Sequence, residues 1–248
     1  MVGLLPLMAV LIAPSWVQHE LPDFVREVEW MMEREPAMMK AITQAEADSG
    51  GEKLTMTLIS KRRRGLLLER LFDENEFLSE FGIRSLSAAY REEYTAEIGG
   101  RSMSIRYTPG ESDIDLFGGN SNWRGPVWFP VNFLVVDSLR LYAASAEGDV
   151  EYEYPTGSGR MVKLSEIVSD LEDRLVNLFR LGPNGRPGDQ REYPNGPLWD
   201  EHVTFSEYFH GDTGVGLGAA HQTGWTALVA HYICSDHAPH LPGVLPGE

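Results

Sequence analysis

Hydrophobic residues recur at helical spacing in three stretches of the chain. Residues 21–34 (LPDFVREVEWMMER) place apolar side chains at i, i+3, i+4 and i+7 with charged ones opposite, which predicts an amphipathic helix that ends near Pro36. The run 126–144 begins with a proline suited to a first helical turn and has one apolar side. Residues 164–179 (LSEIVSDLEDRLVNLF) have the most regular helical pattern of the three. The main elements are therefore expected to be helices.

The remaining segments are shorter or richer in Gly and Pro. Residues 2–13 are apolar and predict a buried core helix, because the run is too short for the about 20 apolar residues that span a bilayer. Residues 81–93 predict a short helix and 220–234 a last apolar helix. Residues 150–164 alternate on both sides of TGSG, which predicts a hairpin. Long helices joined by Gly/Pro/aromatic loops predict an all-α fold whose loops carry a site.

Charge and cysteine content limit the partners. The 248 residues include 21 Lys and Arg against 37 Asp and Glu, a formal charge of −16. This charge repels phosphate backbones and anionic lipid, so we expect neither nucleic acid nor membrane as a partner. A single cysteine, Cys234, leaves no internal disulfide, and we expect a reducing, cytoplasmic location. The apolar N-terminal run imitates a signal peptide but lacks a preceding Lys or Arg and a good cleavage site.

Cofactor and metal motifs are weak. Residues 214–219 (GVGLGA) fit the letters of the dinucleotide fingerprint, but they follow YFHGDT rather than a buried strand. The seven histidines include no H-E-x-x-H, and His237 and His240 lie in a Pro-rich tail that cannot be helical. We therefore expect no cofactor and no metal.

Two stretches combine aromatic side chains with polar groups. In residues 118–132 (GGNSNWRGPVWFPVN), the Trp faces can stack on sugar rings while Asn and Arg bond to hydroxyls, which indicates a sugar-binding loop. The alternative is that both tryptophans belong to the core and that Arg124 pairs with Asp113 or Asp115. In the second stretch, 204–218, Glu207 stands among aromatic residues as either a structural ion-pair partner or an acid–base group.

The chain resembles the C-terminal part of the catalytic domain of glycoside hydrolase family 63 in four segments that extend these stretches: 77–87 (FLSEFGIRSLS), 109–132, 155–159 (PTGSG) and 205–230. This group contains processing α-glucosidases and mannosylglycerate-hydrolase-like enzymes. The most specific motifs are W-R-G-P-x-W and the F-x-E-Y…T-G…G-W-T block. The resemblance implies that residues 1–233 are the C-terminal portion of an (α/α)6 catalytic domain and that 234–248 form a tail. We therefore expect an all-α chain forming part of a toroid, with long loops and one small β-hairpin.

The resemblance also implies an inverting mechanism with one acid and one base carboxylate, and the base falls at Glu207. The candidate substrate-binding residues are Asn122, Trp123, Arg124, Trp128, His221 and Trp225. In the family, the acid is an aspartate of an earlier helix pair, and we find no counterpart of its motif in this sequence.

We therefore expect the C-terminal part of an inverting α-glycosidase that acts on an oligosaccharide or small glycoside, truncated and inactive alone. A missing upstream half-domain, or a second copy of the chain, would then cover the apolar N-terminal run. One alternative is a non-catalytic carbohydrate-binding remnant. Another is an enzyme whose acid lies within this chain, at Asp113, Asp115 or Glu111.

Overall fold

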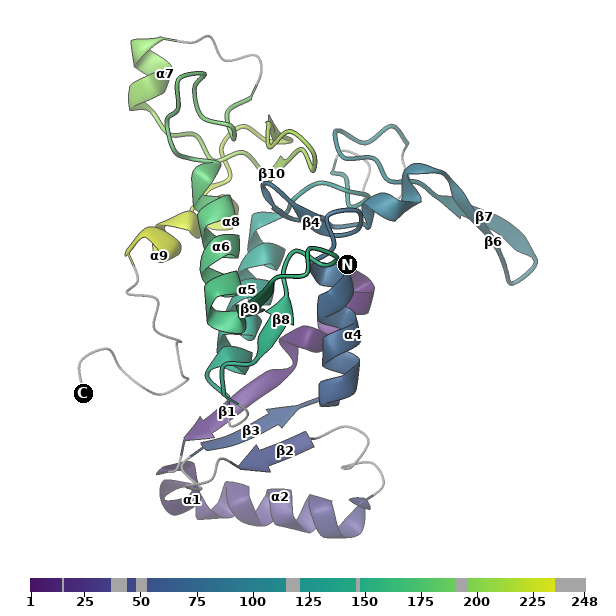
Figure 1. Ribbon diagram of the computed structural model, residues 1–248, viewed down its shortest axis with the longest axis vertical. Helices are drawn as coiled ribbons and strands as arrows, with labels where there is room; N and C mark the ends of the chain where they lie inside the picture. The colour runs from purple at the N-terminus through teal and green to yellow at the C-terminus, as the bar shows by residue number, and fades with distance from the viewer. Residues whose placement is uncertain are drawn as a thin grey trace.

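A computed structural model describes residues 1–14, 16–36, 44–47, 53–114, 121–145, 148–190 and 196–234 (Figure 1). The helices are α1 (Trp16–Glu20), α2 (Pro22–Arg34), α4 (Lys61–Leu71), α5 (Phe129–Ala143), α6 (Leu164–Asn177), α7 (Pro197–Glu201), α8 (Thr223–Thr226) and α9 (Val229–Cys234), with the 3-10 helices η1 (Val2–Met8) and η2 (Ala88–Arg91). Within these residues no helix is long and apolar enough to cross a membrane.

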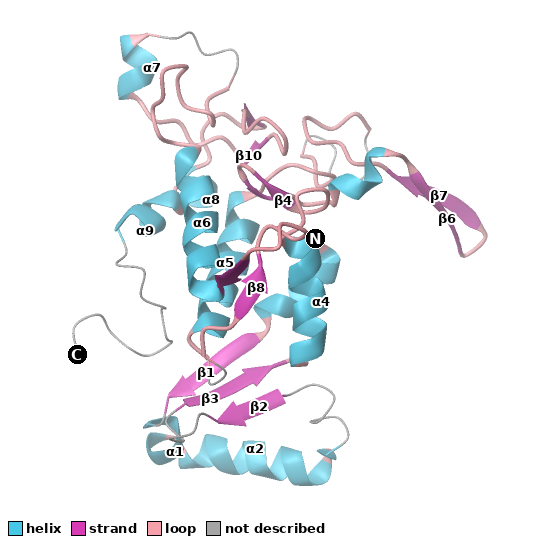
Figure 2. Cartoon of the chain, in the orientation of Figure 1, coloured by secondary structure: helices cyan, strands magenta, loops and turns pink. Residues whose placement is uncertain are grey.

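Among the described residues, the strands form five small antiparallel sheets (Figure 2). The largest has the order β1 (Val10–Pro14), β3 (Lys53–Thr57), β2 (Gln44–Ala47). The other four are two-stranded: β4 (Leu78–Ser79) with β5 (Gly82–Ile83), β6 (Tyr94–Ile98) with β7 (Arg101–Ile105), β8 (Glu151–Glu153) with β9 (Met161–Lys163), and β10 (Tyr208–Phe209) with β11 (Gly216–Leu217). The prediction of an all-α chain with one hairpin is therefore wrong, and the described fold is a mixture of helices and short sheets.

The N-terminal run accounts for part of this error. Residues 2–13 are not one helix: η1 ends at Met8, and β1 then pairs with β3 in the register Ile12↔Thr55. The run is only partly buried: Ile12 is 1% exposed, whereas Val2 is 80% and Leu5 is 46% exposed. The partner of strand β1 lies more than forty residues further along the chain. Local periodicity cannot reveal such a pairing, and a short apolar run fits a strand as well as a helix.

The three clearest helical patterns are confirmed as α2, α5 and α6. Helix α5 begins at Phe129 rather than at Pro126, and Pro130 occupies its first turn. The segment 81–93 is not an α-helix, because it contains β5 and η2, and the expected last helix is divided into α8 and α9. The hairpin in 150–164 is confirmed as β8–β9.

The core lies along α5 and α6, which pack against each other. Figure 1 shows the β1–β3–β2 sheet and α2 at one end of this helix pair, and the loops around β4 and β10 at the other. No described residue of α2 is buried, and Trp30 on this helix is 53% exposed. The fully buried residues Val135, Leu139 and Leu175 lie at the centre of the pair. Helices α5 and α6 thus support the loops around β4 and β10, which include the candidate site residues predicted from the sequence.

Candidate active site

Glu207 lies immediately before β10, at the open end of the β10–β11 hairpin. Its backbone N–H donates to the carbonyl of Ala219 across the hairpin (3.0 Å), and the N–H of Ala219 donates to Oε2 of Glu207 (3.0 Å). The carboxylate is therefore held by its own hairpin, and the side chain is only partly exposed. A carboxylate fixed by a backbone N–H in this way keeps one orientation without needing a cationic partner.

Gly218 makes this arrangement possible. Its φ of +69° lies in the left-handed region that favours glycine. A Cβ at this position would lie 2.7 Å from Oε2 of Glu207 and 2.6 Å from Cε1 of Tyr208, closer than such atoms can approach. The glycines of 214–219 therefore close a hairpin around Glu207. They do not open a helix, as a dinucleotide-binding loop would.

The tryptophans of the two motif blocks meet at Trp128, which contacts Tyr208, the residue after Glu207. Trp123 stacks on Trp128 (ring centroids 4.0 Å apart, interplanar angle 4°), and Trp128 stacks on Tyr208 (4.6 Å, 24°). Trp225 contacts Trp128 edge to face (6.1 Å, 85°). Because Trp128 is 1% exposed, it supports the other rings, whereas Trp225 is 38% exposed and Trp123 is partly exposed. Only Trp123 and Trp225 present surface on which a sugar ring could stack.

Asn122 organises the loop that carries these rings. Its Nδ2 donates to the carbonyls of Thr108 (2.6 Å) and Gly110 (2.7 Å), and its Oδ1 accepts from the N–H of Arg124 (3.0 Å). Its own carbonyl accepts from Nε1 of Trp128 (2.8 Å). The Asn122 side chain is 1% exposed with its polar atoms bonded to the protein, so its contribution to a sugar site is to shape the loop.

Arg124 is also directed into the protein. It is 4% exposed and forms an ion pair with Asp113, which confirms the pairing considered from the sequence; Asp115 lies outside the described residues. Asp113 bonds in addition to Arg106 (2.6 Å). The hydrogen bond from Arg124, reinforced by Arg106, lowers the pKa of Asp113. An aspartate that stays ionised at neutral pH is a poor proton donor, which argues against Asp113 as the general acid.

The structure adds a contact at the site that the sequence does not indicate. The hydroxyl of Tyr208 donates to Oε2 of Glu111 (2.5 Å), although 97 residues separate the two. Burial, together with this hydrogen bond and the charges of Glu111 and Glu207, raises the pKa of Tyr208. The sequence suggests Glu111 only as a possible acid, and Tyr208 only as an aromatic neighbour of the base. Nothing in the local pattern of either segment indicates their contact.

The last candidate, His221, lies at the edge of the group. It is exposed, and its ring centroid lies 5.5 Å from that of Phe205. The structure thus brings Glu207, the tryptophans and the Asn122–Arg124 loop together around Tyr208, with His221 just beyond the end of the hairpin.

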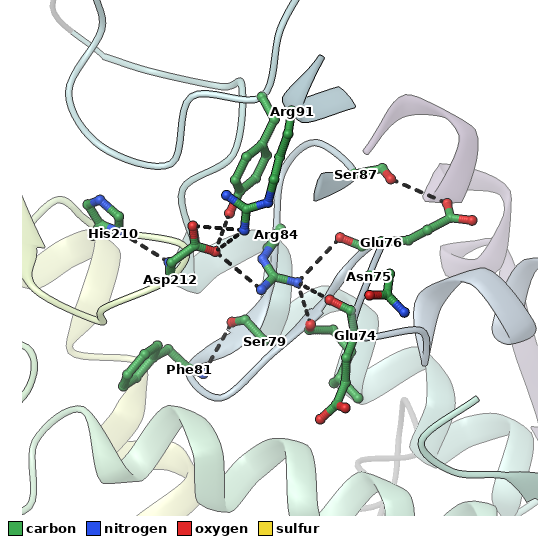
Figure 3. A network of polar contacts seen from close by, with 12 residues as sticks. Glu74, Asn75, Glu76, Ser79, Phe81, Arg84, Ser87, Arg91, His210 and Asp212 are labelled. Atoms are coloured by element: carbon green, nitrogen blue, oxygen red, sulfur yellow. Dashed lines mark hydrogen bonds and ion pairs between the residues drawn. The ribbon is translucent and has the colours of Figure 1, made fainter. Parts of the chain in front are cut away.

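A network around Asp212 anchors the turn that follows β10 (Figure 3). Asp212 accepts hydrogen bonds from the hydroxyl of Tyr107 (2.8 Å) and from Arg91 (3.0 Å), and it pairs with Arg84 (3.3 Å). The guanidinium of Arg84 also bonds to the carbonyls of Glu74, Glu76 and Leu78. Burial favours the neutral carboxyl, but the hydrogen bonds from Tyr107 and Arg91 outweigh it and lower the pKa of Asp212.

Metal-binding groups are not found in the part of the chain that the structure describes: it contains no cluster of three or more His, Cys, Asp or Glu side chains suited to an ion.

Comparison with known proteins identifies the family of the chain. Residues 54–226 match the family model of the mannosylglycerate hydrolase MGH1-like glycoside hydrolase domain. The chain belongs to this family and is a family 63-like glycoside hydrolase domain.

Its relatives are much longer proteins. The chain is 41% identical over 241 residues to the uncharacterized protein YMR196W of Saccharomyces cerevisiae, covering 94% of this chain and 22% of that protein. It is 29% identical over 121 residues to the mannosyl-oligosaccharide glucosidase of the same yeast, covering 48% of this chain and 12% of the enzyme. It is 26% identical over 171 residues to a probable mannosyl-oligosaccharide glucosidase of Schizosaccharomyces pombe, covering 69% of this chain and 15% of that protein. The chain thus spans less than a quarter of the length of these relatives.

Proposed function

We propose that this chain supplies the general-base side of the active site of an inverting α-glycosidase, with Glu207 as the base. The observation that carries the proposal is the position of this carboxylate, fixed by the N–H of Ala219 beside a stack of aromatic rings. The proposal has a sugar ring stack on Trp123 or Trp225 with its anomeric carbon facing the base. Glu207 then deprotonates a water molecule that attacks this carbon from the face opposite the leaving group.

An inverting enzyme also needs an acid about 6.5–9.5 Å from the base, across the sugar. Asp113 is held in ion pairs with Arg106 and Arg124 and is a poor candidate. The proposal therefore takes residues 1–233 as a portion of a catalytic domain whose acid comes from a region present in the longer relatives but unmatched by this chain. On this view the 248-residue chain alone binds sugar weakly and does not hydrolyse it.

The test is a chimera in which this chain replaces the matching 241-residue segment of the yeast protein YMR196W. The substrates are α-linked glucose and mannose disaccharides and mannosylglycerate, and the product anomer is followed by proton NMR. We expect the chimera to release the β-anomer. Glu207→Gln preserves the size of the side chain but removes the base, so turnover should fall by roughly 10²–10⁴.

The matched control is Glu201→Gln, at an exposed carboxylate on α7, which should leave turnover unchanged. Undiminished turnover in Glu207→Gln would contradict the role of the base. Hydrolysis by the 248-residue chain alone would show that the acid lies within it.

The second candidate function, a non-catalytic carbohydrate-binding module, is favoured by the partly exposed faces of Trp123 and Trp225. It predicts that sugars quench tryptophan fluorescence in both the chain and the chimera while neither turns over substrate.

A further inference from the structure

The Glu111 carboxylate joins segments that are far apart in the sequence. Its Oε2 accepts from the hydroxyl of Tyr208 (2.5 Å), and its Oε1 accepts from the backbone N–H of Gly218 (3.1 Å). The next residue, Ala219, donates its N–H to Glu207 (3.0 Å). Two consecutive peptide groups therefore hold the two carboxylates, one each.

The backbone at Gly218 explains how this is possible. In an extended strand, successive N–H groups point in opposite directions, but the left-handed φ of +69° turns the chain so that both can serve neighbouring anions. The carbonyl of Gly218 belongs to the peptide group that carries the Ala219 N–H. It accepts from Nε2 of Gln190 (3.2 Å), so a third segment also holds this peptide group. The orientation of the Ala219 N–H, and with it that of Glu207, thus depends on what holds Gly218.

Charge alone does not account for the position of Glu111. Among the described residues no ion pair of Glu111 is found, and Arg106 and Arg124 bond to Asp113. Placing a second carboxylate near Glu207 adds Coulomb repulsion. The contacts that offset this repulsion, from Tyr208 and Gly218, both belong to the hairpin that carries Glu207. Glu111 therefore acts on the part of the molecule that positions the base.

We propose that Glu111 is a positioning residue: by holding the Tyr208 hydroxyl and the Gly218 N–H, it keeps the Ala219 N–H aimed at Glu207 and the base aimed at the attacking water. This inference rests on the proposed function of Glu207. Because the rings available to the sugar are those of Trp123 and Trp225, removal of Glu111 alters the geometry of the base and leaves the binding surface in place.

The first experiment uses the 248-residue chain and needs no turnover. Hydrogen exchange measured by NMR reports the protection of the Gly218 and Ala219 amides. Glu111→Ala should speed exchange at both amides. Glu111→Gln should largely restore protection, because the amide oxygen can accept from the Gly218 N–H while the amide N–H donates to the Tyr208 hydroxyl oxygen. Glu153→Ala is the matched control, because Glu153 accepts from the N–H of Gly159 (2.7 Å) in another hairpin and should not affect residues 218 and 219.

The second experiment uses the chimera. Glu111→Ala should lower kcat by roughly 10–100-fold with KM nearly unchanged, since a small misplacement of a catalytic group costs rate rather than binding. Glu111→Gln should recover most of that loss, and Glu153→Ala should behave as wild type.

Unchanged Ala219 exchange in Glu111→Ala would overturn the inference whatever the activity. Normal wild-type turnover with an unchanged kcat in Glu111→Ala would overturn the role of Glu111 alone. A wild-type chimera with no turnover would overturn the proposed function, and with it the role of Glu111.

Discussion

Trp123 lies flat on Trp128, with ring centroids 4.0 Å apart and planes within 4° of parallel. The inner ring is almost fully buried, and its Nε1 bonds to the carbonyl of Asn122 (2.8 Å). The outer ring keeps part of its surface exposed. The two tryptophans of one short motif therefore have different roles, one as a support and the other as a surface for ligands.

Substitution of the two rings should separate these roles. Trp128→Ala creates a cavity at the centre of the aromatic group and should lower the free energy of unfolding by roughly 3–5 kcal/mol. Trp123→Ala should cost about 1 kcal/mol and remove most of the fluorescence quenching by sugars, because it deletes exposed stacking surface. Urea denaturation and sugar titrations check both results. Equal stability losses in the two variants would contradict the assignment.

Gly218 is a hairpin glycine whose replacement should disturb Glu207 directly, since its added methyl group would meet the carboxylate itself. In Gly218→Ala, the new methyl group would collide with Tyr208 and Glu207 at a backbone angle that already disfavours alanine. We expect a loss of roughly 2–4 kcal/mol in the free energy of unfolding, together with altered near-ultraviolet circular dichroism of the aromatic stack.

Gly157 is the matched control, since its φ is +85° and a methyl group added there would meet no atom within 4 Å. Gly157→Ala should therefore cost only the conformational strain, about 1 kcal/mol. A similar loss at both positions would show that contacts with Glu207 and Tyr208 do not limit residue 218.

A buried ion pair between α5 and α6 should be sensitive to removal of one partner. Arg140 is 5% exposed and Glu172 is 3% exposed, and their side chains bond to each other. Glu172→Gln leaves the buried guanidinium with Asp137 (3.4 Å) as its counter-charge and should cost up to roughly 3–5 kcal/mol. The control is Asp173→Asn in the exposed pair with Arg180, where about 0.5 kcal/mol or less is expected. Thermal denaturation of the two variants and of wild type measures the two losses of stability.

The sequence predicted the long helices well because each has a local apolar period, as in α6. It failed where an element depends on a distant partner: β1 pairs with β3, and β5 lies in a segment expected to be helical. In the candidate site, too, local motifs were predicted and contacts between distant segments were not. Recognisable motifs indicated Glu207 and the tryptophans, but the contact of Glu111 with Tyr208 depends on how two loops meet in space, and no periodicity records it.

Asp212 should make stability depend on pH in the acid range. Its folded-state pKa is lowered, since the hydrogen bonds from Tyr107 and Arg91 outweigh the effect of burial. A carboxyl whose pKa is depressed by folding stabilises the fold above its unfolded pKa, about 3.9, and this contribution is lost as the pH falls through the lower folded value. Asp212→Asn should therefore lower the free energy of unfolding by about 2 kcal/mol at pH 7.

The difference between wild type and Asp212→Asn should be constant above about pH 5. It should shrink as the pH falls below about 4, because the carboxyl of the unfolded chain takes up a proton before that of the folded protein does. Urea denaturation at pH 7, 5 and 3 measures it. Asp23→Asn, in an exposed pair with Arg26, is the control and should stay within about 0.5 kcal/mol of wild type at each pH. A difference for Asp212→Asn that persists undiminished at pH 3 would mean that the carboxylate charge is not what joins Arg84 and Arg91 to the turn after β10.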